Sequence, residues 1–322
     1  MTAAAPPTGP TRRTGLVALL ASGLPVRAEE IRRVLLATAT PGGGFPAFGE
    51  AFVAAIRACD PSLEVEARAS GGSAENLGLL RSGAVDLALV QGEYAYPALD
   101  EVREAGGLSV LAPMYATPGL FVVPAGSAVR TVEDLRGRPV ALGTHNSGLT
   151  VMGRSVLVAS GLDPERDIRP ILLDRAGDGP AMVLDGRAAA LWGGGLGWPG
   201  FLAVARAPGG ARFFGPDADA VGRLVRTGSA LKRLAVPAGS FPGQSDAIDT
   251  VGSWSLILAR PSFDAETAYR LVRALTRARP EMEARHPQGG ESDPRNLAGL
   301  VPATRINPGT ARYLREAGVS VE

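Results

Sequence analysis

Short apolar runs alternate with helix-like segments along this 322-residue chain, and this alternation limits its possible folds more than any other feature. Residues 34–39 form a strand candidate, and residues 63–67 alternate apolar with charged side chains as a half-buried strand does. Each run leads through a glycine-containing turn into a segment whose apolar side chains have helical spacing. Such alternation is typical of parallel α/β proteins. The sequence therefore predicts an α/β fold.

The same pattern starts again after residue 131. Residues 140–143 form a strand candidate, and a polar turn and an amphipathic segment follow it. Because the turns come in two sets, we expect two lobes with a hinge and an interlobe cleft. The first lobe is expected to comprise residues 29–124 and 251–322, and the second residues 125–250. In such units a ligand lies beyond the carboxyl ends of the strands, where helix N-termini present N–H groups.

The N-terminus has the order of segments found in a secretory signal peptide. Arg12 and Arg13 precede a short apolar run at 16–21, and Val26-Arg27-Ala28 supplies small residues at a cleavage position. The apolar run is too short to span a membrane. We therefore expect residues 1–28 to direct export to the periplasm, by the Sec route or, given the paired arginines, by the twin-arginine route.

Charge and motif content argue against several classes of function. Lysine and arginine total 33 against 32 acidic residues, with no basic stripe, so no nucleic acid partner is expected. Cys59 is the only cysteine and is expected to be a small packing residue. His145 lies in a polar turn, where a hydrogen-bonding role is expected, and His286 precedes a proline in a polar loop and is expected to be solvated. Without catalytic or metal-ligand spacing, we expect neither an enzyme, nor a metal, nor a cofactor.

One glycine motif leaves an alternative open. Residues 195–200 match the G-x-G-x-x-G pattern of dinucleotide-binding turns. Pro199 removes an N–H group from the loop that would cradle a pyrophosphate, and the match lies in mid-chain. A glycine-rich wall of a cleft explains the same residues.

Three polar turns are better candidates for ligand contact. They are Gly43-Gly44-Phe45, Gly72-Ser73 with Asn76, and Asn146-Ser147-Gly148. Each alone could be an ordinary helix N-cap. Two such turns facing each other across a cleft would bind an anion through backbone N–H groups without any arginine.

Motifs along most of the chain after residue 30 resemble the TAXI family, the solute-binding subunits of TRAP (tripartite, ion-gradient-driven) transporters. The most distinctive is Gly-Gly-Ser-Ala-Glu-Asn-Leu at 71–77, continued by Asp-Leu-Ala-Leu-Val-Gln at 86–91. The remaining similar segments lie at residues 111–115, 131–143, 147–148, 237–244, 250–254, 286–287 and 307–319.

This resemblance implies a two-lobed periplasmic-binding-protein fold of type II-like topology. It also implies a carboxylate or amino-acid-like ligand such as glutamate, and delivery to the membrane subunits of a TRAP transporter. The alternatives are a subunit of an ABC importer or a periplasmic sensor, and, less favoured, an exported α/β enzyme. The ligand-binding residues expected from the turns and the resemblance are Gly44, Phe45, Gly72, Ser73, Asn76, Gln91, Tyr115, Asn146, Ser147, Gly148, Trp192, Gly193 and Gly194.

Four departures from the family pattern bear on the ligand. Phe45 stands where tyrosine is usual, and Leu149 where threonine is usual, so two hydroxyl groups are lost. Glu93 replaces a usual aspartate, and glycines at 193–195 replace larger apolar residues. These changes predict a roomier or less polar pocket than a glutamate site.

Overall fold

The computed structural model describes residues 1–5, 31–101, 107–227 and 230–321, and residues 31–322 form one compact unit. Residues 1–5 have no regular secondary structure, and the core of the expected signal peptide lies outside the described residues. The strands are β1 (Arg32–Ala37), β2 (Leu63–Arg68), β3 (Leu87–Val90), β4 (Ser109–Pro124), β5 (Pro139–Thr144), β6 (Arg169–Leu173), β7 (Ala190–Gly194), β8 (Ala211–Phe214), β9 (Lys232–Val236) and β10 (Ile248–Ala259). The helices are α1 (Gly44–Cys59), α2 (Ser73–Arg81), α3 (Gly92–Glu101), α4 (Gly148–Ala159), α5 (Gly179–Leu184), α6 (Pro199–Arg206), α7 (Ala218–Arg226), α8 (Ala265–Arg277), α9 (Arg279–Arg285) and α10 (Pro308–Glu316).

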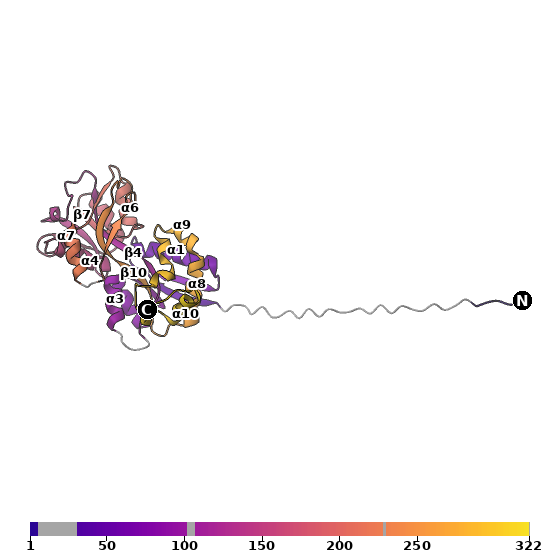
Figure 1. The fold of residues 1–322 in the computed structure, drawn as a ribbon. Helices are drawn as coiled ribbons and strands as arrows, with labels where there is room; N and C mark the ends of the chain where they lie inside the picture. The colour runs from indigo at the N-terminus through magenta and orange to yellow at the C-terminus, as the bar shows by residue number, and fades with distance from the viewer. Residues whose placement is uncertain (6–30, 102–106, 228–229, 322) are drawn as a thin grey trace. The chain divides into compact units, whose positions relative to one another are not determined.

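The folded unit has two halves, the first built on the parallel strands β1, β2 and β3 and the second on β5, β6 and β7. Two long strands connect these halves. The strand order is β2-β1-β3-β10-β4-β7-β5-β6, with β8 also pairing with β4 and β9 with β10. The first part of β4 pairs with β10, and its last part, from Gly119 onward, pairs with β7 and β8. In Figure 1, α1, α8, α9 and α10 gather in the first half and α4, α6 and α7 in the second, with β4 and β10 between them. The expected two-lobed α/β fold is confirmed.

Parallel strands and helices build each half in the predicted way. Strands β2, β1 and β3 run parallel in the first half, and β6, β5 and β7 run parallel in the second. Phe48 and Phe52 of α1 are fully buried on the first sheet, as their helical spacing predicts. In the second half, Met152 and Val156 of α4 are fully buried in the corresponding way.

The two long strands pair antiparallel and approach each other closely at a glycine. A Cβ atom on Gly252 of β10 would lie 2.2 Å from the carbonyl oxygen of Thr117 on β4. Only glycine leaves room for the backbones at this distance. Both long strands contribute to the core of the second half. Phe121 of β4 and Val251 of β10 lie in one buried cluster with Trp192 of β7. These two strands bring the carboxyl ends of the two parallel sheets opposite each other.

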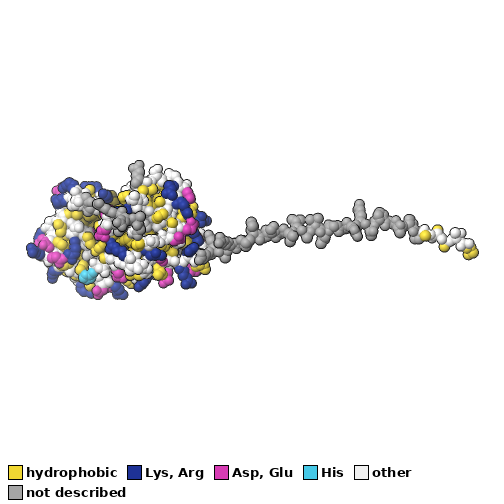
Figure 2. Space-filling model, turned by 90° about the horizontal axis from the view of Figure 1, so that it is seen from below, with side chains coloured by type: hydrophobic (Ala, Val, Ile, Leu, Met, Phe, Trp, Pro, Cys, Tyr) yellow, Lys and Arg dark blue, Asp and Glu magenta, His cyan; other side chains and the backbone are white. Residues whose placement is uncertain are grey.

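On the face shown in Figure 2, the described basic and acidic side chains are interspersed. This face therefore has no single-sign patch of the kind that attracts nucleic acid.

Candidate functional site

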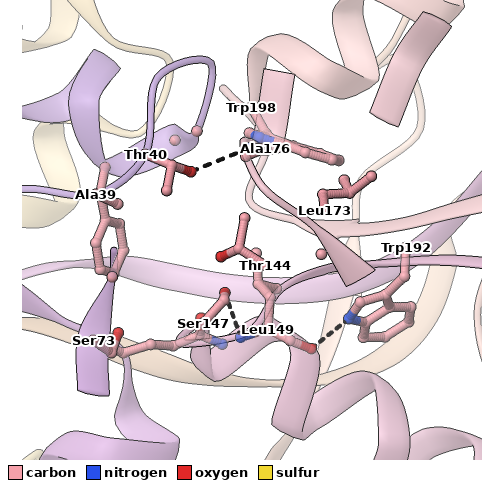
Figure 3. A pocket seen from close by; sticks show the side chains of 16 residues that line it. Ala39, Thr40, Ser73, Thr144, Ser147, Leu149, Leu173, Ala176, Trp192 and Trp198 are labelled. Atoms are coloured by element: carbon pink, nitrogen blue, oxygen red, sulfur yellow. Dashed lines mark hydrogen bonds between the residues drawn. The ribbon is translucent and has the colours of Figure 1, made fainter. Parts of the chain in front are cut away.

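A cavity lies between the halves, at the ends of their parallel strands (Figure 3). Its volume is about 60 Å³, counted as space for the centres of water molecules. The apolar side chains that line it are Ala39, Phe45, Leu149, Leu173, Ala176, Trp192 and Trp198. The polar side chains are Thr40, Ser73, Gln91, Thr144 and Ser147, and backbone is exposed at Gly43, Gly44, Gly72 and Gly143.

The two lining serines, Ser73 and Ser147, stand at helix N-termini from different halves. Ser73 is the first residue of α2, and its Oγ accepts a hydrogen bond from the Gln91 N–H at 3.1 Å. Ser147 is the N-cap of α4, and its Oγ accepts from the Leu149 N–H at 3.1 Å. The two serines lie on the same side of the cavity in Figure 3. The positive ends of two helix dipoles are thereby brought to one cavity.

Aromatic side chains form much of the remaining wall. The Trp192 indole Nε1 donates to the Leu149 carbonyl at 2.7 Å, which fixes the ring against α4. Trp198 is 5 % exposed and packs edge-to-face on Phe201, with ring centroids 4.8 Å apart. Its ring lies where a side chain on Gly193 would stand, since a Cβ there would be 1.9 Å from Trp198 Cζ3. The glycine at 193 therefore serves to seat this tryptophan.

The halves touch each other around the cavity. The Ala74 N–H donates to the Asn146 carbonyl at 3.1 Å, next to the two serines. On the other side, the Ala176 N–H donates to Thr40 Oγ1 at 3.1 Å, and the Gly177 N–H to the Pro41 carbonyl at 3.2 Å. These bonds join loops that belong to opposite halves, so the structure represents a closed arrangement.

Seven of the residues expected to contact a ligand line this cavity. They are Gly44, Phe45, Gly72, Ser73, Gln91, Ser147 and Trp192. Three others are immediate neighbours of the wall. Gly148 packs against the Gln91 side chain, Gly194 against Leu149, and Asn146 contributes its carbonyl to the contact between halves.

The remaining expected residues lie behind the wall. Asn76 is fully buried, and its amide donates to the Thr38 and Leu89 carbonyls, both at 2.8 Å. It therefore ties α2 to the ends of β1 and β3. Tyr115 is buried beneath Gly44, where a Cβ would lie 3.1 Å from the tyrosine hydroxyl oxygen. Gly193, as described above, faces Trp198.

His286 is buried, and the expectation that it is solvated is wrong. It is 3 % exposed and stacks on Tyr115, with ring centroids 5.2 Å apart, and it meets Phe48 edge-on at 5.7 Å. Burial lowers the pKa of His286 to about 4, so the ring is neutral at physiological pH. The local sequence is polar, but the segment after α9 turns back under β4, which the sequence did not reveal.

Lining residues outside the expected set come mainly from the second half. Thr144 directly follows the strand candidate at 140–143, so its position was a usable signal. Leu173 and Ala176 belong to β6 and the loop after it, and they reach the cavity only because that loop contacts Thr40. Trp198 stands inside the G-x-G-x-x-G match, and its ring forms part of the cavity wall.

A half-buried glutamate, whose Oε1 atom is removed from solvent, lies behind Gln91. Glu93 opens α3, and its Oε2 accepts a hydrogen bond from Ser253 Oγ of β10 at 2.9 Å. Its Oε1 is buried and, within the described residues, has no hydrogen-bond partner. Burial raises the pKa of Glu93 to about 7, although its polar neighbours Ser253 and Gln91 oppose the shift. This carboxyl group is therefore largely protonated below neutral pH.

The described part of the chain contains neither a metal-ligand cluster nor a helix that could span a membrane. No three or more His, Cys, Asp or Glu side chains lie close enough together there to hold a metal ion. None of the described helices combines the length and the apolar character needed to cross a bilayer.

Comparison with known proteins gives one family. The model that describes the NMT1-like family matches residues 36–318.

Solved structures with similar folds have low sequence identity to this chain. The periplasmic aliphatic sulphonate-binding protein SsuA of Escherichia coli is 18% identical, with a TM-score of 0.48 over 88% of this chain and 83% of that one. A putative sulfonate ABC transporter's periplasmic sulfonate-binding protein from Methylobacillus flagellatus is 13% identical, with a TM-score of 0.49 over 91% and 96%. An H2O2-bound OxyR mutant of Corynebacterium glutamicum is 13% identical, with a TM-score of 0.48 over 79% and 68%.

Proposed function

This chain belongs to the NMT1-like family, and from its interlobe cavity we propose that it is an exported protein that binds a small organic anion and delivers it to a membrane importer. One observation carries the proposal. Ser73 and Ser147, at the N-termini of α2 and α4, line the same cavity although they come from different halves. A ligand touching both helix ends would favour the closed arrangement of the halves, because it interacts with both only when they are close.

The chemistry of the wall supports binding rather than catalysis. Among the described lining residues there is no ionisable side chain that could act as an acid, a base or a charged nucleophile. Serine hydroxyls without a neighbouring base are weak nucleophiles. An exported enzyme would need an acid, a base or an activated nucleophile, and the described residues of this wall supply none of them.

We expect a panel of organic anions to contain at least one compound that raises the melting temperature. A compound present at 100 times its dissociation constant stabilises the folded state by about 2.7 kcal/mol, which corresponds to roughly 5 °C for a chain of this size. Differential scanning fluorimetry on protein purified from a periplasmic extract checks this. Indifference to every anion in the panel would count against a solute-binding role.

For the importer, the motifs that resemble the TAXI family favour a TRAP transporter. An ABC importer is the second candidate, since the Methylobacillus flagellatus protein of similar fold is named as part of a putative sulfonate ABC transporter. Reconstituted transport distinguishes the two. Uptake that needs the protein and an ion gradient supports the TRAP partner, whereas uptake that needs the protein and ATP supports the ABC partner.

Export is tested at the N-terminus. If residues 1–28 are a signal peptide, the periplasmic protein begins at Glu29. Intact mass measurement of that protein gives the cleavage position directly. A full-length mass in the cytoplasmic fraction alone would contradict export.

A further inference from the structure

The cavity wall has no charged side chain. None of the described residues that line it is Asp, Glu, Lys, Arg or His. An ammonium group in this cavity would therefore lose its water without meeting a carboxylate. Leaving a buried charge unpaired costs several kcal/mol. A ligand that carries a positive charge does not fit this site.

Hydrogen-bond donors, in contrast, are in excess on one side. In the described part of the chain, neither the N–H of Ser73 nor that of Gly148 has a hydrogen-bond partner. The hydroxyls of Ser73 and Ser147 already accept one N–H each and keep their own hydrogen to donate. These groups match the oxygens of one anionic head group.

The side chain of Gln91 lies next to these donors. Gln91 lines the cavity and is 2 % exposed, and its amide nitrogen Nε2 makes no well-formed hydrogen bond among the described residues, although it interacts with the Glu93 carboxyl group behind it. A buried amide nitrogen without a well-formed hydrogen bond is costly, so an oxygen of a ligand is a better acceptor for it than Glu93 as it stands. An oxyanion next to Ser73 would be within the reach of this side chain.

The opposite side of the cavity is apolar and the space is small. Figure 3 shows Trp198 and Ala176, with Thr40 hydrogen-bonded to Ala176, across from Ser73 and Ser147. Leu173 lies near Trp198, and Trp192 lies beside Leu149. A volume of about 60 Å³ corresponds to roughly four to six water molecules. The part of a ligand that points away from the serines therefore has to be short and apolar.

We propose that the cavity takes a monoanion with one oxyanion head group on a short apolar body, and that it rejects α-amino acids and dicarboxylates. This inference rests on the proposed function and narrows its ligand class. The head group lies between the N-termini of α2 and α4, and the body packs on Trp198 and Leu173. Carboxylates and sulfonates share the chemistry of such a head group.

Calorimetric titration of the purified protein with matched compounds tests the inference. The probe is 3-methylbutanoate. Valine adds an ammonium group to the same skeleton, glutarate has the same number of carbons but carries two carboxylates, and 3-methylbutanamide removes the charge. We expect 3-methylbutanoate, or 2-methylpropane-1-sulfonate if the head group is a sulfonate, to bind at least about 100-fold more tightly than these three.

A variant locates the head group. Ser147→Ala is expected to weaken binding of the preferred anion about tenfold, because it removes one donor beside the head group. Ser155→Ala is the matched control, since Ser155 lies on the same helix and does not line the cavity. Equal affinities in the two variants would contradict the placement of the head group.

The results separate this inference from the proposed function. If valine or glutarate binds as tightly as 3-methylbutanoate, the inferred ligand class is wrong and a solute-binding role stands. If no anion in a broad panel binds, both fail. Because the ligand series is measured on the unaltered protein, the conclusion does not depend on the folding of any variant.

Discussion

Replacing Glu93 by glutamine is expected to raise the free energy of unfolding by about 3 kcal/mol at pH 8 and to change it little at pH 4. The carboxyl group is buried against β10, and its pKa is raised from 4.5 to about 7. Glutamine has nearly the shape of the protonated side chain and never ionises. The difference in the free energy of unfolding between the variant and the unaltered protein therefore measures how much the ionised carboxylate destabilises the fold.

The sign of the pH dependence follows from the direction of the shift. Between pH 4.5 and about 7 the folded protein holds a proton on Glu93 that the unfolded chain has released. The stability that the protonated group contributes is thus complete below pH 4.5 and is lost as the pH rises through 7. A shift of about 2.5 pKa units corresponds to roughly 3 kcal/mol.

Urea unfolding from pH 4 to pH 8 measures this effect, provided that the variant is compared with the unaltered protein at each pH. The comparison is needed because His286 acts in the opposite direction: its lowered pKa makes the protein lose stability as the pH falls from 6.5 through 4. Subtracting the two proteins at each pH removes the His286 contribution. Glu101→Gln, at the exposed end of α3, is the control and is expected to change stability by less than about 1 kcal/mol. A difference between Glu93→Gln and the unaltered protein that does not vary with pH would refute the assignment.

Local patterns in the sequence predicted the elements that carry the cavity. Helix α1 with its buried phenylalanines, helix α2 after Gly72, and helix α4 after Ser147 follow from apolar spacing and turn residues. Because each of these turns follows a parallel strand, their meeting at one end of the sheets follows from the α/β pattern as well. This is why seven expected residues line the cavity.

Only the end of the long strand β4, the apolar run at residues 121–124, followed from local patterns. Pro113 and Pro118 interrupt it, and proline in a run ordinarily argues against a strand. In the structure Pro113 stands opposite Leu256, beside a register shift in β10, and Pro118 stands opposite Gly252, in the last pair of the ladder between β4 and β10. The missing N–H of Pro113 thus falls where the pairing is irregular, and that of Pro118 where this ladder ends. Only the partner strand, more than 100 residues away, makes these positions acceptable.

The side chains that complete the wall depend on such distant contacts too. Leu173 and Ala176 reach the cavity because the loop after β6 hydrogen-bonds to Thr40 across the cleft. His286 is buried because the segment after α9 packs beneath Tyr115. Neither arrangement leaves a periodic signal in the residues concerned. The sequence therefore predicted the helix ends of the site better than its apolar side.

Replacing Gly72 by alanine is expected to weaken the binding of 3-methylbutanoate by at least about tenfold. Gly72 has φ 120° and ψ −163°, a conformation that only glycine adopts readily, and an added side chain there costs of order 1–3 kcal/mol. The added Cβ would also lie 3.1 Å from the Asn146 carbonyl oxygen, which belongs to the other half. The alanine thus both strains the turn before α2 and holds the two helix ends apart.

Gly78→Ala separates this effect from a general change in helix α2. Gly78 is exposed in the middle of that helix, and a Cβ atom added to it would have no atom outside the helix within 4 Å. Alanine there is expected to stabilise the protein by about 0.5–1 kcal/mol and to leave binding unchanged. Calorimetric titration and thermal unfolding of both variants give affinity and stability independently. Gly72→Ala separates the two helix ends, whereas Gly78→Ala does not. Equal affinities of the two variants for the anion would therefore show that the site does not depend on the close approach of these helix ends.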